Sequence, residues 1–167
     1  MKISCSVLAI AILTLAATLQ AQTPAQNKEA PMAHAAGSFD VKITPQDDKL
    51  SDGISRMLSE KQYHGDLEGT SKGQMLATGS AKSSGVYVAI ETFTGTLHGK
   101  TGGFALHHTG IMAKGVPSLS ISVVPDSGTG QLAGIAGKMN IIIAPDGKHS
   151  YESVSYTHLT LPTTPYV

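Results

Sequence analysis

Glu91 and His108 are the side chains of this 167-residue sequence whose chemistry depends most on their surroundings. Alternate residues of an extended chain share a face, so Glu91 lies with Tyr87, and His108 lies with Phe104. If these faces point inward, burial raises the pKa of the carboxyl group and lowers the pKa of the imidazole. Such groups are candidates for a binding or acid–base site, and we predict Tyr87, Glu91, Phe104 and His108 as ligand-binding residues. The alternative, which we prefer, is a structural pair in which the carboxylate and the imidazole bond each other or the backbone.

Two other motifs match known sites only in their residue letters. Residues 69–73 match the nucleophile elbow, but that motif needs a strand-to-helix turn, and we expect a hairpin turn at Lys72-Gly73. Residues 128–134 resemble a dinucleotide fingerprint, but no βαβ unit surrounds them. We assign no catalytic residue and predict no cofactor.

A metal site is the remaining alternative. His64, Asp66 and Glu68 have the i, i+2 spacing that would place three ligands on one face of a strand. A solvated polar face explains this spacing equally well. His107 and His108 are adjacent, so on a strand they point to opposite faces and cannot share one metal. We therefore predict no metal.

The elements that must position these groups are short strands. The sequence has 18 glycines, which favour turns, and no long amphipathic helix follows the first segment. Several short alternating runs separated by Gly and Pro predict an all-β barrel or sandwich. The expected strands are residues 38–44, ended by Pro45, then 63–70, a run starting at 75–77, 86–97, 101–111 after the turn at 98–100, 118–124, a buried run at 139–144 closed by a turn at 145–147, and 150–156. Residues 54–62 could form a short helix or a strand, and the family resemblance described below favours a strand.

The first residues are typical of a secretory signal peptide. Lys2 precedes an apolar stretch over residues 3–19, and Ala21 offers a small residue for cleavage. An uncleaved membrane anchor is the alternative, since the stretch is about as long as the shortest membrane span. We predict a signal peptide at 1–21, a disordered linker at 22–37 and a periplasmic or secreted location.

Composition restricts what the exported domain at 38–156 can do. The only cysteine, Cys5, lies in the leader, so cleavage would remove thiols and disulfides. The 12 Lys and Arg residues balance the 12 Asp and Glu residues, which leaves no electrostatic footprint for nucleic acid. Residues 157–167 do not fit the domain and read as an artefactual or disordered tail.

Several motifs in order resemble a bacterial family of uncharacterised domains, DUF3224. They are Gly65-Asp66-Leu67-Glu68-Gly69, residues 87–91 and 95–104, His108-Thr109-Gly110, and residues 123–132, within a likeness that runs from about Ser38 to Tyr151. The resemblance implies a closed eight-stranded antiparallel barrel similar to the allene oxide cyclases. Gln131 departs from the family pattern, where Glu is usual. The alternation also breaks after Tyr151, so we expect the closing strand to be lost there.

Three functions are compatible with such a barrel. The leading hypothesis is an exported protein that binds a small apolar molecule in the lumen or mouth of the barrel. The second is an enzyme of the cyclase or isomerase type, assisted by Glu91 or His108. The third is a structural or oligomeric module with a filled core. No nucleic-acid partner is expected, no membrane partner is expected after cleavage, and homo-oligomers are left open.

Overall fold

The computed structural model describes residues 34–47, 52–80 and 82–158, and the regular structure in these ranges consists of β-strands. The predicted signal peptide, most of the predicted linker and the end of the tail lie outside the described residues. In the described part of the chain, no helix is long and apolar enough to cross a lipid bilayer. The strands are β1 (Ala36–Gln46), β2 (Ser55–Gly65), β3 (Leu67–Gly79), β4 (Gly85–Leu97), β5 (Lys100–Ala113), β6 (Val116–Val123), β7 (Thr129–Gly130), β8 (Ile135–Ile143) and β9 (His149–His158).

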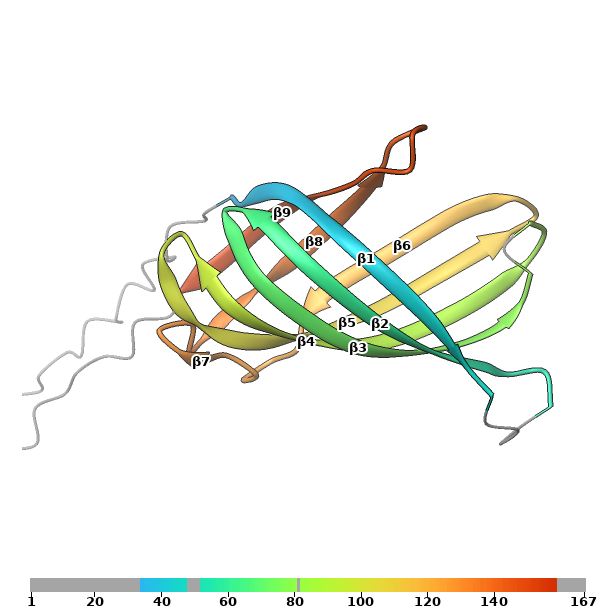
Figure 1. The fold of residues 1–167 in the computed structure, drawn as a ribbon, viewed down its shortest axis with the longest axis horizontal. Helices are drawn as coiled ribbons and strands as arrows, with labels where there is room; N and C mark the ends of the chain where they lie inside the picture. The colour runs from blue at the N-terminus through green and yellow to red at the C-terminus, as the bar shows by residue number, and fades with distance from the viewer. Residues whose placement is uncertain (1–33, 48–51, 81, 159–167) are drawn as a thin grey trace, which may run out of the picture.

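Eight of these strands close into an antiparallel barrel (Figure 1). β1 to β6 pair in chain order, β8 and β9 follow, and β9 pairs with β1 to complete the ring. The two-residue strand β7 pairs with β5 at Gly102 and Gly103 and lies beside the end of the ring. The predicted all-β class and the closed eight-stranded barrel are confirmed.

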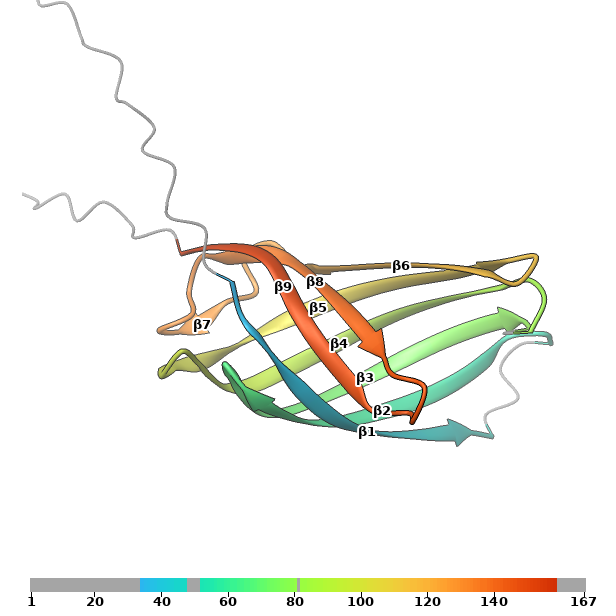
Figure 2. The ribbon, with the colours of Figure 1, turned by 90° about the horizontal axis from the view of Figure 1, so that it is seen from above.

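The hairpin of β8 and β9 is fastened to the rest of the barrel only over short stretches. β6 pairs with β8 at Ile121–Met139 and Ser122–Lys138, and β1 pairs with β9 only from Ala36 to Phe39. Beyond these pairs the hairpin diverges from β6, while β4, β5 and β6 run on (Figure 2). The barrel therefore has a fully walled half and a half that is open between β6 and β8.

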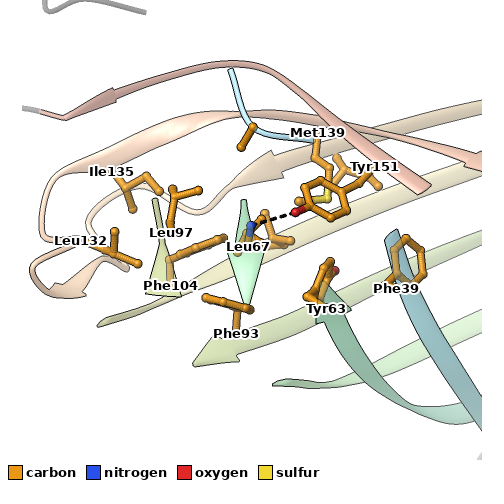
Figure 3. Close-up of a cluster of buried hydrophobic side chains, with 13 residues drawn as sticks. Phe39, Tyr63, Leu67, Phe93, Leu97, Phe104, Leu132, Ile135, Met139 and Tyr151 are labelled. Atoms are coloured by element: carbon orange, nitrogen blue, oxygen red, sulfur yellow. Dashed lines mark hydrogen bonds between the residues drawn. The ribbon is translucent and has the colours of Figure 1, made fainter. Parts of the chain in front are cut away.

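The walled half contains the hydrophobic core. Aromatic rings from four strands meet there: Tyr63 of β2 packs edge-on against Phe93 of β4 and Tyr151 of β9, and Phe93 packs against Phe104 of β5 (Figure 3). Beneath them Leu132, in the loop before β8, closes this end of the lumen at 1% exposure. Burial of this apolar area is the main source of stability in the fold.

The predicted strands are largely confirmed, with corrections at their ends. Pro45 was expected to end the first strand, but β1 continues to Gln46. This end of β1 has no β9 partner, and a proline without an N–H is tolerated on such an edge. The turn expected at Lys72-Gly73 is also wrong, since both residues lie inside β3 and the hairpin turns at Gly65-Asp66.

Two expectations about the last strands are wrong as well. The closing strand does not stop at Tyr151, because β9 continues to pair with β8 as far as His158, with an irregularity opposite Lys138 and Met139. The run at 139–144 is not uniformly buried: Met139 is 6% exposed, but Ile143 is 64% exposed. Its side chains alternate between the lumen and the exterior, and its end reaches the open half of the barrel.

Candidate functional site

A cluster of polar side chains lies inside the barrel at the upper edge of the aromatic core. Lys61 comes from β2 and Glu91 from β4, and Nζ of Lys61 donates a 2.5 Å hydrogen bond to Oε2 of Glu91. The hydroxyl of Tyr63 donates to the other carboxylate oxygen, Oε1, at 2.7 Å. Nζ also lies 4.9 Å from the centre of the Phe39 ring, a cation–π contact. The charge of Lys61 is therefore engaged on several sides by groups of the protein itself.

Glu91 is ionised in this setting. Burial by itself raises the pKa of the Glu91 carboxyl, but the nearby His108 and Lys61 side chains outweigh that effect and hold the pKa at about 2. Burial and the negative charge of Glu91 together raise the pKa of Tyr63 far above its usual range. At neutral pH the cluster therefore holds a carboxylate and a neutral phenol.

His108 of β5 completes the cluster without being fully bonded in it. Its Nε2 atom lies 3.2 Å from Oε2 of Glu91, but the N–H is not aligned as a hydrogen bond. Nε2 of His108 and Oγ of Ser71 are buried and have no hydrogen-bond partner among the described residues. Both side chains nevertheless help to lower the pKa of Glu91, so they belong to the buried polar cluster around this carboxylate.

The strand register shows what lies directly above this cluster. Inward residues paired across neighbouring strands form rows, and one row runs from Met75 through Ala89 and His108 to Ile121. Glu91 belongs to the row beneath, where it pairs with Gly73 and Leu106. The row above His108 consists of Ala77, Tyr87, Gly110 and Leu119.

A cavity of about 320 Å³ occupies this upper part of the lumen. All four residues of the row above His108 line it, and Ile143 of β8 lines it from across the opening. The ring of Tyr87 lies close against Gly110, where a Cβ atom would come within 2.0 Å of the ring. The lining is mainly apolar, and the residues in it that carry hydroxyl groups are Thr78, Tyr87 and Ser118. The cavity can therefore hold a small, mainly apolar molecule.

The structure brings three of the four predicted site residues into this region. Glu91 and His108 contact each other, as the structural-pair interpretation expected, and Tyr87 lines the cavity above them. Phe104 lies in the walled half, 5.1 Å from the ring of Phe93, and does not line the cavity. The cavity stops one row above His108 and two rows above Glu91.

Sequence analysis missed Lys61, Tyr63 and Ser71. The signal that could have found them is the alternation of β2 and β3: once Tyr63 is placed inside, Lys61 must also point inward. A buried carboxylate also requires a cationic or hydrogen-bonding partner, so an inward-facing lysine on a nearby strand is the partner to expect for Glu91.

The proposed metal alternative gains no support from the geometry. His64 lies near the end of β2, Asp66 lies in the turn and Glu68 lies in β3, so the three residues do not share one strand. Among residues 34–47, 52–80 and 82–158, no group of three His, Cys, Asp or Glu side chains is placed to hold a metal ion.

Comparison with known proteins identifies the family. The family model described as "Protein of unknown function (DUF3224)" matches residues 35–154. A DUF3224 protein of unknown function from Shewanella oneidensis MR-1, known from its crystal structure, is 41% identical, with a TM-score of 0.71 over 78% of this chain and 100% of that one. No functionally curated protein matches the chain. The chain belongs to the DUF3224 family.

Proposed function

We propose that this protein is an exported β-barrel that binds a small, mainly apolar molecule in the open half of its lumen. The observation that carries the proposal is the cavity of about 320 Å³, whose lining is mainly apolar. Apolar molecules gain free energy when they leave water for such a surface.

The distribution of packing supports binding over a purely structural role. The walled half is filled by aromatic rings and aliphatic side chains. A structural module without a ligand would require the whole lumen to be filled in this way. The open half is different, because Leu119 and Ile143 face inward and still remain 41% and 64% exposed. Apolar side chains that line a concave, solvent-accessible surface are typical of a ligand site.

A fluorescent apolar probe tests this proposal. We expect the uncharged dye N-phenyl-1-naphthylamine to bind saturably to the purified protein, with enhanced emission. Ala77→Phe places a ring in the cavity and should weaken binding at least tenfold. Val88→Phe is the matched control, since Val88 points outward and is 48% exposed, and it should bind as the wild type does. Absence of dye binding to the wild type, or equal binding to Ala77→Phe, would contradict the proposal.

Mass spectrometry of co-purified compounds tests the same site without a chosen probe. A native ligand should be recovered from the wild type and from Val88→Phe, and it should be depleted in Ala77→Phe. Circular dichroism of each variant confirms that the barrel is intact before the recoveries are compared.

Export is the second part of the proposal and rests on the signal-peptide pattern of residues 1–21. Expression of the full chain in a bacterial host should release a protein that begins near Gln22 into the periplasm or the medium. Intact mass measurement checks this, and a cytoplasmic protein that retains Met1 would contradict export.

A further inference from the structure

We propose that the outer face of the sheet formed by β3 to β6 binds a second copy of this chain, so that the protein forms a two-fold symmetric dimer. This inference goes beyond the proposed function and does not rest on it, because the face lies on the outside of the barrel wall. It follows from the side chains on this face, from their exposure and from the distribution of charge around the barrel.

The strand register defines the face. Outward residues pair across neighbouring strands in rows, and three successive rows run without interruption from β3 to β6. The rows consist of the first, third and fifth residues of the ranges 74–78, 86–90, 107–111 and 118–122. We call these outward positions the neutral face.

Apolar side chains form the centre of the neutral face. Three consecutive outward residues of β4, Val86, Val88 and Ile90, are 39%, 48% and 64% exposed. Leu76 of β3 pairs with Val88, Ile111 of β5 pairs with Val86, and both are 47% exposed. Single exposed apolar side chains are common on soluble proteins, but a contiguous group of them marks an interaction surface.

The distribution of charge indicates what kind of partner fits this surface. None of the residues of the neutral face is Asp, Glu, Lys or Arg, whereas exposed charged residues occur on other strands of the ring, such as Lys42 on β1, Glu60 on β2, Lys138 on β8 and Glu152 on β9. In a two-fold interface the same patch meets itself, so a charged residue near the axis is brought toward its own copy and repelled. A face without charges meets itself without this repulsion.

Hydroxyl groups border the apolar centre. β6 contributes Ser118, Ser120 and Ser122, while Thr78 and Thr109 lie in the same rows as Val86 and Val88. A hydroxyl group both donates and accepts hydrogen bonds, so two copies of this border can bond to each other. An apolar centre with a polar rim is the usual arrangement of a protein interface.

The neutral face is large enough for the core of a dimer interface. Outward residues of a strand are about 6.7 Å apart and neighbouring strands about 4.8 Å apart, so three rows across four strands cover about 400 Å². One more row at each end, together with β2 at the side, brings the area to about 800 Å² per copy, which is the size of a standard specific interface. The dimer would thus consist of two sheets packed face to face.

Sedimentation velocity over a range of protein concentrations tests the dimer. We expect the wild type to sediment as a reversible dimer. Val88→Lys places a charge at the centre of the neutral face and should raise the dissociation constant at least about tenfold. Ile142→Lys is the matched control, because Ile142 is an outward residue of β8 with the same exposure of 48%, and it should dimerise as the wild type does.

A chemical cross-link locates the contact without adding a charge. Cys5 is the only cysteine of the chain, so in a Cys5→Ser background a single new cysteine reports on its own surroundings. Val88→Cys should be joined to its copy by a bismaleimide with a reach of about 10 Å, which is the spacing of two packed sheets. Ile142→Cys should give no cross-linked dimer, and circular dichroism checks that each variant is folded.

The outcomes are distinct from those of the proposed function. A wild type that stays monomeric at every concentration would overturn the inference, and so would a dimer that Val88→Lys leaves intact or that Ile142→Lys dissociates equally. A monomer that instead binds to vesicles of neutral lipid would assign the neutral face to a membrane surface and would also overturn it. Dye binding in the lumen is measured separately, so either proposal can fail while the other holds.

Discussion

Nζ of Lys61 and Oε2 of Glu91 lie 2.5 Å apart, and these two side chains are 8% and 2% exposed. They come from β2 and β4, so their contact passes across the inner face of β3, which separates the two strands in the sheet. The pair therefore joins β2 to β4 across β3 from within the lumen. It also lies at the upper edge of the aromatic core, two inward rows below the cavity.

Removal of one partner of this pair should be strongly destabilising. We expect Glu91→Gln or Lys61→Met to lower the free energy of unfolding by about 3–5 kcal/mol, because each leaves a buried group without its partner. The double variant Lys61→Met/Glu91→Gln should lose less than the sum of the single losses. Urea unfolding of the four proteins gives the coupling energy.

An exposed ion pair between β2 and β3 provides the control. Lys72 and Glu60 are 3.9 Å apart, with Lys72 82% exposed, and Lys72→Ala should change the stability by less than about 0.5 kcal/mol. Equal losses in the buried and the exposed pair would show that burial does not strengthen the Lys61–Glu91 contact.

Stability should also decrease in acid through Glu91. The pKa of this carboxyl is lowered from 4.5 to about 2 by folding, so the unfolded chain takes up the proton first as the pH falls. The stabilisation is complete above pH 4.5 and is lost as the pH falls through about 2, a total of about 3 kcal/mol. Unfolding curves between pH 6 and pH 2 should record most of this loss, about 3 kcal/mol. Glu91→Gln should have a flatter profile, and identical profiles would assign the acid sensitivity to other carboxyls.

Tyr151 should stabilise the barrel through its hydroxyl group. That oxygen accepts a 2.8 Å hydrogen bond from the buried backbone N–H of Leu67 and lies 3.3 Å from the carbonyl oxygen of His64, to which it donates (Figure 3). Tyr151→Phe should cost about 1–3 kcal/mol in unfolding free energy, because the N–H of Leu67 would remain buried without a partner. Tyr87→Phe, at the partly exposed wall of the cavity, should cost less than about 1 kcal/mol. A larger loss of unfolding free energy for Tyr87→Phe than for Tyr151→Phe would contradict the stabilising role assigned to the hydroxyl of Tyr151.

Gly110 should control the position of the Tyr87 ring. A Cβ atom at Gly110 would come within 2.0 Å of Cε1 of Tyr87, so Gly110→Ala must move the ring. We expect a stability loss of about 1–3 kcal/mol and weaker binding of N-phenyl-1-naphthylamine, since the displaced ring enters the cavity. Thr109→Ala, at the neighbouring position on β5, should bind the dye normally. Unchanged dye affinity in Gly110→Ala would mean that the dye does not occupy the space beside Tyr87.

The strands could be predicted because apolar and polar residues alternate clearly wherever one face of a strand is buried in the barrel. The clearest case is β4, where Tyr87, Glu91 and Phe93 point inward as expected. Errors occurred where local signals conflict with tertiary pairing. Gly73 lies inside β3, where the side chain of Ser59 and the backbone of β4 leave little room for a Cβ atom. The glycine therefore allows close packing and does not mark a turn, and the neighbours that require it are distant in the sequence.

The site was only partly predictable for a related reason. Alternation placed Glu91 and His108 on inward faces, but it could not determine which rows of the barrel are filled and which are hollow. That depends on how few residues of β8 pair with β6 and how few residues of β9 pair with β1. Because the pairing of β6 with β8 is limited to Ile121 and Ser122, Leu119 has no paired residue on β8 and stays exposed. Phe104 has the same alternation as His108, but it lies two inward positions further into the walled half.

The short pairing of β8 with its neighbour also affects how a molecule reaches the lumen. β1 to β6 are joined by long ladders, whereas the hairpin is held to β6 at Ile121 and Ser122 alone. An outward rotation of the hairpin would break few hydrogen bonds, and it would widen the entrance without disturbing the six-stranded wall. Local opening between β6 and β8 should therefore require less free energy than global unfolding.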